Sequence, residues 1–412
     1  MPWLDWITLA VRWFHVVAGV AWIGASFYFI WLDNNLKQPP QWKKDKGIKG
    51  DLWAVHGGGF YEVSKYAYGP EKMPEPLHWF KWEAYTTWLS GMLLLTLVYY
   101  LGASAYLIDP SVMPLSPAQS ITYGIGFIVG GIALYEIACR TPLARSQLLF
   151  ALFFIAMLAF ASWLSSQLFS GRGAYIHMGA LIGTIMAGNV FFNIMPSQRK
   201  MVAAVANKQD IDPAWGAGAK LRSVHNNYLT LPILFIMISN HYPMTYQHPQ
   251  NWLVLVLMSV ILAWIRHFFN LKHQGIKKPW ILISGFVAFL ALALWTSYPR
   301  DAISTPMTQG EQNSEQQNEQ HSAIAANITQ QQVAQLIATH CTGCHAANPT
   351  DETFKIAPGG VKFDTWEEIQ RWSPRIVHRT TVTKDMPFLN KTKMTEAERQ
   401  VIATWFNSQR PG

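Results

Sequence analysis

The chain has 412 residues, half of them hydrophobic and only 14% charged, whereas about a quarter of the residues in a soluble domain are charged. The formal net charge of +8 would favour nucleic-acid binding in a soluble protein, but the basic residues lie mostly between apolar segments, so we expect no nucleic-acid partner. Two of the three cysteines share one short motif, which disfavours a disulfide framework.

Apolar segments dominate residues 1–300, which we expect to form a transmembrane domain in contact with membrane lipid. A helix that crosses a bilayer needs about 20 predominantly apolar residues. Eight runs approach that length: 7–31, 85–108, 121–139, 148–168, 175–195, 224–240, 252–269 and 280–298. The sequence therefore predicts an all-α, eight-helix transmembrane bundle with a large cytoplasmic loop at about 32–84. The first run is too long for a signal-peptide core and has no convincing cleavage site, so we expect it to be retained.

Lysine and arginine set the expected orientation. They are frequent after the first, third, fifth and seventh runs, whereas the loops after the second, fourth and sixth contain only Arg172. Because cytoplasmic loops carry the excess of positive residues, the odd-numbered loops are predicted to be cytoplasmic. Both termini would then be periplasmic in a bacterial inner membrane.

Histidines within apolar runs are candidate haem ligands, because ionisable side chains are costly inside a bilayer. His15 and His177 lie in the first and fifth runs, and a rise of about 1.5 Å per residue places both toward the periplasmic side. They could hold one haem b iron between them. The alternative is that one or both form hydrogen bonds within the bundle. Gly19 and Gly24, close to His15, would let a macrocycle or a neighbouring helix approach.

Polar residues at the cytoplasmic ends of the second, sixth and seventh runs form a second candidate site. Arginine makes paired hydrogen bonds to carboxylate or carbonyl oxygens, and tryptophan offers a stacking face, which suits a planar anion. We expect catalytic roles for Glu83, His225, Arg266 and His267, and substrate-binding roles for His78, Trp82, Asn226 and Asn227. The alternative is that these residues only meet lipid headgroups and water.

The polar segment 301–326 is expected to be a flexible tether, and residues 327–412 a small class I-like cytochrome c domain. The sequence Cys341-Thr-Gly-Cys344-His345 fits C-x-x-C-H, the attachment motif of covalent haem c. We expect one haem c, with His345 and Met386 as axial ligands of the iron. Met394, at a predicted helix start, is the alternative sixth ligand.

Zinc and redox-active thiols are the competing interpretations of the motif. A zinc site would need a second Cys/His pair, but only the isolated His378 follows. A thioredoxin-like pair would need a βαβ context, which the sequence lacks.

Four stretches carry a family resemblance: RWFHVVAGVAWIGASFYFIWLDN, HWFKWEAYTTWLSG, GNVFFNIMPSQRKMV and RSVHNNYLTLPILFIMIS. Together with the C-terminal C-x-x-C-H they resemble the bacterial membrane-bound urate hydroxylases (urate oxidases) with a cytochrome c domain, over essentially the whole chain. The resemblance implies oxidation of urate to 5-hydroxyisourate in purine catabolism. Electrons would pass through haem to an external respiratory acceptor, such as cytochrome c or a terminal oxidase, without forming hydrogen peroxide.

The residues fit this chemistry, with Glu83 or a nearby histidine as general base. Two other classes stay open: a transporter for a purine-like solute with an appended redox domain, and a quinol-linked electron-transfer subunit. Many transporters contain internal repeats, which the sequence does not show. A quinol-linked subunit should have two matched histidine pairs across the membrane, and the sequence offers one.

Overall fold

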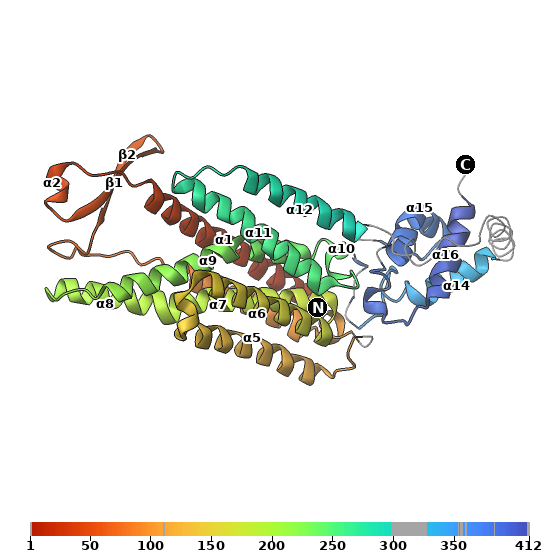
Figure 1. The fold of residues 1–412 in the computed structure, drawn as a ribbon. Helices are drawn as coiled ribbons and strands as arrows, with labels where there is room; N and C mark the ends of the chain where they lie inside the picture. The colour runs from red at the N-terminus through yellow and green to blue at the C-terminus, as the bar shows by residue number, and fades with distance from the viewer. Residues whose placement is uncertain are drawn as a thin grey trace.

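The computed structural model describes residues 2–109, 112–297, 328–352, 354, 357–358, 361–382 and 384–409. These residues are mostly helical (Figure 1). The bundle, residues 2–297, contains α1 (Pro2–Asn35), α3 (Trp82–Leu94), η1 (Leu95–Tyr100), α4 (Ala103–Tyr106), α5 (Pro117–Arg140), η2 (Pro142–Arg145), α6 (Gln147–Leu168), α7 (Gly171–Gly188), η3 (Asn189–Ile194), α8 (Met195–Ala206), α9 (Pro213–Ser239), α10 (Pro243–Tyr246), α11 (Asn251–His273) and α12 (Trp280–Ser297). The tether expected at 301–326 lies outside the described residues.

Within the described residues, six helical segments are long and apolar enough to cross a membrane. They lie in α1, α5, α6, α7 continued through η3 into α8, α11 and α12. The other two predicted runs do form helices. However, the run at 85–108 is divided by η1 and a turn before α4, and α9 carries polar residues such as Arg222 and Asn226 in its middle. The described residues are therefore mostly helical, and six of the eight predicted spans correspond to helical segments that could cross a membrane.

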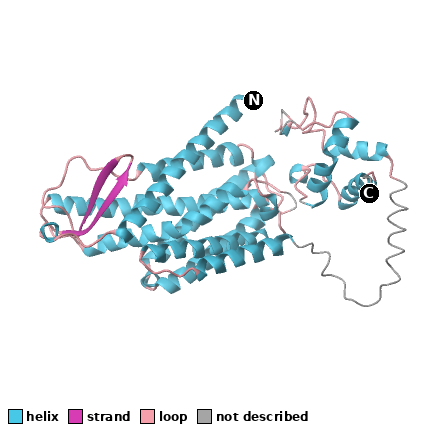
Figure 2. Ribbon diagram, turned by 90° about the horizontal axis from the view of Figure 1, so that it is seen from above, coloured by secondary structure: helices cyan, strands magenta, loops and turns pink. Residues whose placement is uncertain are grey.

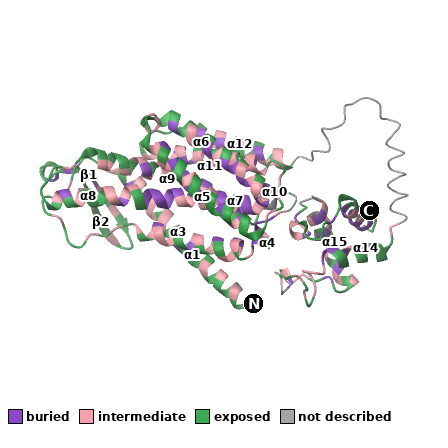
Figure 3. Cartoon of the chain, turned by 90° about the horizontal axis from the view of Figure 1, so that it is seen from below, coloured by how far each residue is buried: buried purple, intermediate pink, exposed green. Residues whose placement is uncertain are grey.

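The core of the bundle is centred on α7, which packs against α5, α6 and α9. Tyr175, Leu181 and Ile185 of this helix are almost completely buried. Large apolar side chains on the outer helices point outward, among them Trp13 of α1 and Ile283 of α12, and Figure 3 shows the exposed class on these helices. An apolar outer surface is what lipid contact requires, because lipid tails are as apolar as the side chains.

The all-α prediction is wrong for the segment at about 32–84, which is predicted to be a loop. This segment contains α2 (Gln41–Lys44) and a two-stranded antiparallel hairpin, β1 (Ile48–His56) and β2 (Gly59–Tyr66) (Figure 2). Gly57 and Gly58 connect the strands with φ of +57° and +80°. Glycine adopts positive φ without a steric penalty, so this glycine pair permits a two-residue hairpin turn. Figure 1 shows the hairpin at the end of the bundle far from the C-terminal residues.

The C-terminal unit, residues 328–409 as described, is helical and has its own core. It contains α14 (Gln330–His340), α15 (Trp366–Val377), η6 (His378–Val382), η7 (Phe388–Asn390) and α16 (Glu396–Ser408). Val333, Ile337 and Ile402 are fully buried where these helices meet. A capping box begins α16: Thr395 N donates to Glu398 Oε2 at 2.7 Å, and Glu398 N donates to Thr395 Oγ1 at 3.3 Å.

Candidate functional site

The C-x-x-C-H motif lies on a large cavity in the C-terminal unit. Cys341, Cys344, His345 and Met386 all line this cavity, whose volume is about 1590 Å³. His345 Nδ1 lies 3.0 Å from the carbonyl oxygen of Val361. A carbonyl only accepts, so Nδ1 carries the proton and Nε2 keeps a lone pair that can bind a metal. Two thiols, an oriented imidazole and a thioether on one cavity fit a covalent haem with His and Met axial ligands.

The two thiols are poor candidates for a redox-active pair. Burial, with a smaller effect of Cys344, raises the pKa of Cys341 to about 12. Burial and the neighbouring Asp351 raise the pKa of Cys344 to about 11. Catalytic thiols instead have a lowered pKa, because the thiolate is the nucleophile. Among the described residues, no group of three or more His, Cys, Asp or Glu side chains could hold a metal ion.

Met394 lies apart from the cavity. It is 3% exposed and belongs to the hydrophobic core of the C-terminal unit. Met386 instead lies on the loop that ends in η7, and its carbonyl oxygen accepts a hydrogen bond from the buried Arg399. The structure thus brings Met386, and not Met394, onto the same cavity as the C-x-x-C-H motif.

A second cavity lies at the hairpin end of the bundle and has a volume of about 590 Å³. Side chains from α1, the segment after β2, the α7–η3–α8 helix and α9 line it. Two predicted substrate-binding residues, His78 and Asn226, are among them, with Gln198, Ser223 and Trp79. Cavities of this size with apolar walls and a few polar groups are typical small-molecule sites.

The predicted cytoplasmic cluster does not form a single site, because consecutive residues of α9 point to different neighbours. His225 Nδ1 lies 2.8 Å from the hydroxyl of Tyr135, and its ring stacks on Phe150 with centroids 4.7 Å apart. Asn226 faces α7 and η3, accepting from Asn189 at 2.8 Å and donating to a carbonyl of α7 at 2.9 Å, and Asn189 also exchanges hydrogen bonds with the Tyr135 hydroxyl. Of these two, only Asn226 lines the second cavity.

Asn227, Arg266 and His267 form a separate group between α9 and α11. Asn227 donates to Asn270 Oδ1 at 2.9 Å and accepts from Arg266 Nε. The Arg266 guanidinium also lies over the ring of Phe27, 3.9 Å from its centroid. His267 Nδ1 is 2.7 Å from the hydroxyl of Tyr228. None of these residues lines either cavity described above.

The two predicted site residues of α3, Trp82 and Glu83, also have different surroundings. The Trp82 side chain is 63% exposed and does not line the second cavity. Glu83 Oε2 is buried and has no hydrogen-bond partner among the described residues. Residues three to four positions apart share a helix face, so Glu83 lies on the face of α3 that carries Thr87 and Ser90, both of which contact His15 of α1; Glu83 does not line the second cavity. The next residue, Ala84, is buried against Trp22 and Trp79. These two tryptophans, but not Ala84, line the second cavity.

A buried polar network went unrecognised in the sequence. Arg222 of α9 donates to both carboxylate oxygens of Glu136 in α5, at 3.0 and 3.1 Å, and to Asn189 Oδ1 at 3.0 Å. Asn189 Nδ2 in turn donates to Asn226. The available signal was the single carboxylate within the apolar stretch ALYEIAC, since an unpaired charge in such a stretch is costly.

His15 and His177 contact different levels of the α3–η1 helix. His15 Nδ1 lies 3.0 Å from Ser90 Oγ, whereas His177 Nε2 lies 3.3 Å from the hydroxyl of Tyr100. Ten residues separate these two contact points, or about 15 Å along the helix axis. Neither histidine lines a described cavity. The two rings therefore contact this helix at different levels, which does not favour one porphyrin shared between them.

Comparison with known proteins gives one match. The family model described as "Urate oxidase N-terminal" matches residues 2–297. No curated protein and no solved structure matches the chain.

Proposed function

Because the chain belongs to the urate oxidase N-terminal family, we propose that it is a membrane-bound urate hydroxylase that converts urate to 5-hydroxyisourate. The observation that carries this proposal is the family match, which covers the whole described bundle, residues 2–297. The six apolar helices support a membrane location. We further propose that α9 and the α3–η1 helix also cross the membrane, which would be a bacterial inner membrane with both termini and the C-terminal unit in the periplasm.

The cavity at the hairpin end is the proposed urate site. Urate is a small, planar anion, and the cavity offers amide, hydroxyl and imidazole groups from Asn226, Gln198, Ser223 and His78 beside the ring of Trp79. The side chain of Asn226 is held by two hydrogen bonds, so its orientation is fixed before a ligand binds. Arg222, the residue directly before Ser223 in α9, lies beside this region with its guanidinium paired to Glu136. The segment between α1 and α3, which contains the hairpin, is rich in lysine and supports a cytoplasmic position for this end of the bundle under the positive-inside rule.

The reaction removes two electrons and two protons from urate and one water molecule, and the water oxygen forms the new C–O bond at C5 of the purine. Loss of electrons makes C5 electrophilic, so water attacks it and releases a proton. Glu83 is the proposed general base, because its buried Oε2 has no partner among the described residues and its neighbour Ala84 packs against the cavity wall. A base can act through one intervening water molecule.

The C-terminal cavity is the proposed haem c site. Cys341 and Cys344 would hold the porphyrin covalently, and His345 and Met386 would bind the iron. When bound, this group accepts one electron at a time, so each urate requires two transfers, and an external respiratory acceptor such as cytochrome c or a terminal oxidase removes them. Hydrogen peroxide is not a product of this scheme.

A membrane haem b at His15 and His177 stays a prediction, but their packing does not favour one shared porphyrin, and we derive no step through it. A pyridine-haemochrome spectrum of the purified protein counts b-type and c-type haem separately and decides this point.

The decisive experiment is the anaerobic addition of urate to the purified protein. We expect the haem absorbance to change to that of the reduced form, with two electrons delivered per urate consumed. Glu83→Gln keeps the side-chain size but removes the base, so we expect reduction to slow by about 10² to 10⁴-fold. Glu71→Gln, which removes an exposed carboxylate from the segment before α3, is the matched control and should react like the wild type.

Two results would overturn the proposal. An unchanged spectrum in protein with a full haem content would exclude urate oxidation. Urate uptake into vesicles that persists in His345→Ala, with no haem reduction, would support solute transport instead.

A further inference from the structure

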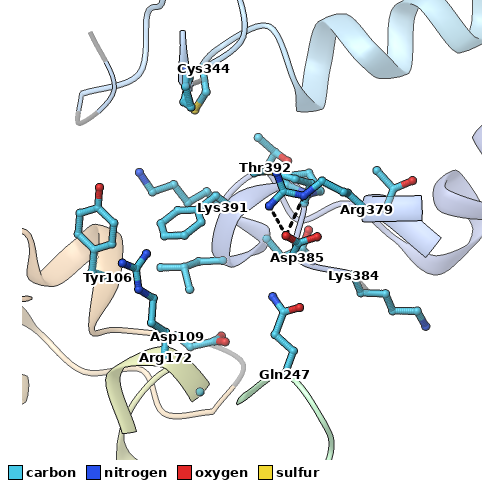
Figure 4. A pocket seen from close by; sticks show the side chains of 18 of the residues that line it. Tyr106, Asp109, Arg172, Gln247, Cys344, Arg379, Lys384, Asp385, Lys391 and Thr392 are labelled. Atoms are coloured by element: carbon cyan, nitrogen blue, oxygen red, sulfur yellow. Dashed lines mark hydrogen bonds and ion pairs between the residues drawn. The ribbon is translucent and has the colours of Figure 1, made fainter. Parts of the chain in front are cut away.

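The C-terminal cavity is not closed by the C-terminal unit alone. Residues of the bundle also line it, including Tyr106, Asp109 and Arg172, and Figure 4 shows them across the cavity from Cys344 and Lys391. The ring of Tyr106 lies against Phe354 and Phe388 of the C-terminal unit, with centroids 6.3 and 5.5 Å apart. These contacts seat the C-terminal unit on the bundle with its C-x-x-C-H cavity facing inward.

Arg172 is held in a fixed position at this seat. Its Nε donates to the hydroxyl of Tyr99 and to Asn240 Oδ1, both at 3.0 Å. The guanidinium also lies over the rings of Tyr99 and Tyr106, 5.8 and 5.3 Å from their centroids. These contacts use Nε and the ring faces, and the two terminal nitrogens have no hydrogen-bond partner among the described residues, so they can meet an anion at the cavity. Arginine presents such a pair to a carboxylate in a matching geometry.

The cavity has an excess of positive charge. Six basic and three acidic side chains line it: Arg172, Arg375, Arg379, Lys384, Lys391 and Lys393 against Asp109, Asp351 and Asp385. Asp385 pairs with Arg379, and Asp351 with Lys391. Arg172 thus faces a unit whose cavity rim is itself basic, and like charges repel across a low-dielectric contact. A bound anion would reverse the sign of this interaction.

We propose that Arg172 binds a propionate carboxylate of the haem c carried by the C-terminal unit, and thereby holds that unit against the bundle. This inference rests on the proposed function, which places haem c in this cavity. The haem supplies two carboxylates, which would offset most of the excess charge. Tyr99 and Asn240 then act as positioning residues that hold the guanidinium toward the cavity.

The test is the reduction potential of haem c in the full-length protein. A cation beside a propionate favours the reduced haem, because reduction lowers the net positive charge at the iron. In Arg172→Gln we therefore expect the potential to become more negative, so that the ratio of reduced to oxidised haem c at a fixed electrode potential falls several-fold. Arg172→Lys keeps the charge without the paired geometry and should lie between the two. The difference should shrink as the salt concentration rises.

Controls separate the possible failures. Arg140→Gln, which removes an exposed arginine of α5, should leave the potential unchanged. A full haem c content in each variant shows that the protein has folded and matured. If haem c is present and Arg172→Gln matches the wild type, the role of Arg172 is wrong while the haem c assignment stands. If the wild type carries no covalent haem, the proposed function fails, and this inference fails with it.

Discussion

Met386 is the residue whose substitution tests the haem c site most directly. Met386→Leu should retain the haem, because Cys341, Cys344 and His345 are unchanged. We expect a more negative haem c potential, because a thioether axial ligand raises it. Met394→Leu should leave the potential unchanged and lower the free energy of unfolding by less than about 1.5 kcal/mol, as volume-conserving core substitutions do. Spectroelectrochemical titration of both variants checks this pair, and the reverse pattern would make Met394 the ligand.

The thiol of Cys344 provides a pH-dependent test in protein produced without haem attachment. Only the thiolate reacts with iodoacetamide, and the pKa of Cys344 is raised to about 11. Because a raised pKa keeps the thiol protonated, the alkylation rate should rise about tenfold per pH unit from pH 7 to 10. An unperturbed cysteine, with a pKa of about 8.5, would level off near pH 9. Mass spectrometry of the peptide that contains Cys344 measures the rate, and a plateau below pH 9 would contradict the raised pKa.

Individual residues differ in how far the sequence could place them. The motif at Cys341, Cys344 and His345 has a spacing that is chemically specific, and the structure places all three on one cavity. Asn226 and Asn227 are adjacent in the sequence, yet they serve different neighbours. Each helical residue turns by about 100°, so the faces they meet depend on which helices pack around α9. That arrangement is a tertiary property that local patterns do not encode.

At the scale of elements, α9 is joined to α5 by a buried ion pair that sequence patterns did not reveal. Arg222→Ala would leave Glu136, which is 16% exposed, with much of its charge uncompensated. We expect the free energy of unfolding to fall by about 3 kcal/mol, because an unpaired buried charge is strongly destabilising. Arg140→Ala removes an arginine that is 76% exposed and 3.7 Å from the same carboxylate, so we expect a loss of about 0–1 kcal/mol. Equilibrium unfolding in detergent compares the two, and equal losses would show that the buried pair contributes little.

The elements themselves were partly predictable. Apolar runs gave the positions of the long helices, because a span needs a continuous apolar segment. The π-helical segments η1 and η3 were not anticipated, since they depend on how neighbouring helices pack. The hairpin was also missed, although Gly57 and Gly58 are a recognised turn signal. Its strands project beyond the long helices (Figure 1) and are largely exposed toward their shared turn, so they lack the simple alternation of a half-buried strand.

At the scale of the whole molecule, the two cavities lie at opposite ends of the bundle, one beside the hairpin and one against the C-terminal unit. The sequence predicts the two candidate sites at opposite ends, because lysine and arginine are concentrated in the loops at one end of the predicted spans. How the C-terminal unit sits on the bundle could not be read from the sequence, because the contacts of Tyr106 with Phe354 and Phe388 join residues 248 and 282 positions apart.

This separation makes the proposed reaction electrogenic. If urate is oxidised at the cytoplasmic end and haem c lies in the periplasm, each turnover carries two negative charges outward and leaves two protons behind. A membrane that is negative inside drives electrons in that direction, by about 2.3 kcal/mol for each electron and each 100 mV. Purine breakdown by this protein would therefore draw on the membrane voltage, and a de-energised cell would oxidise urate with less driving force.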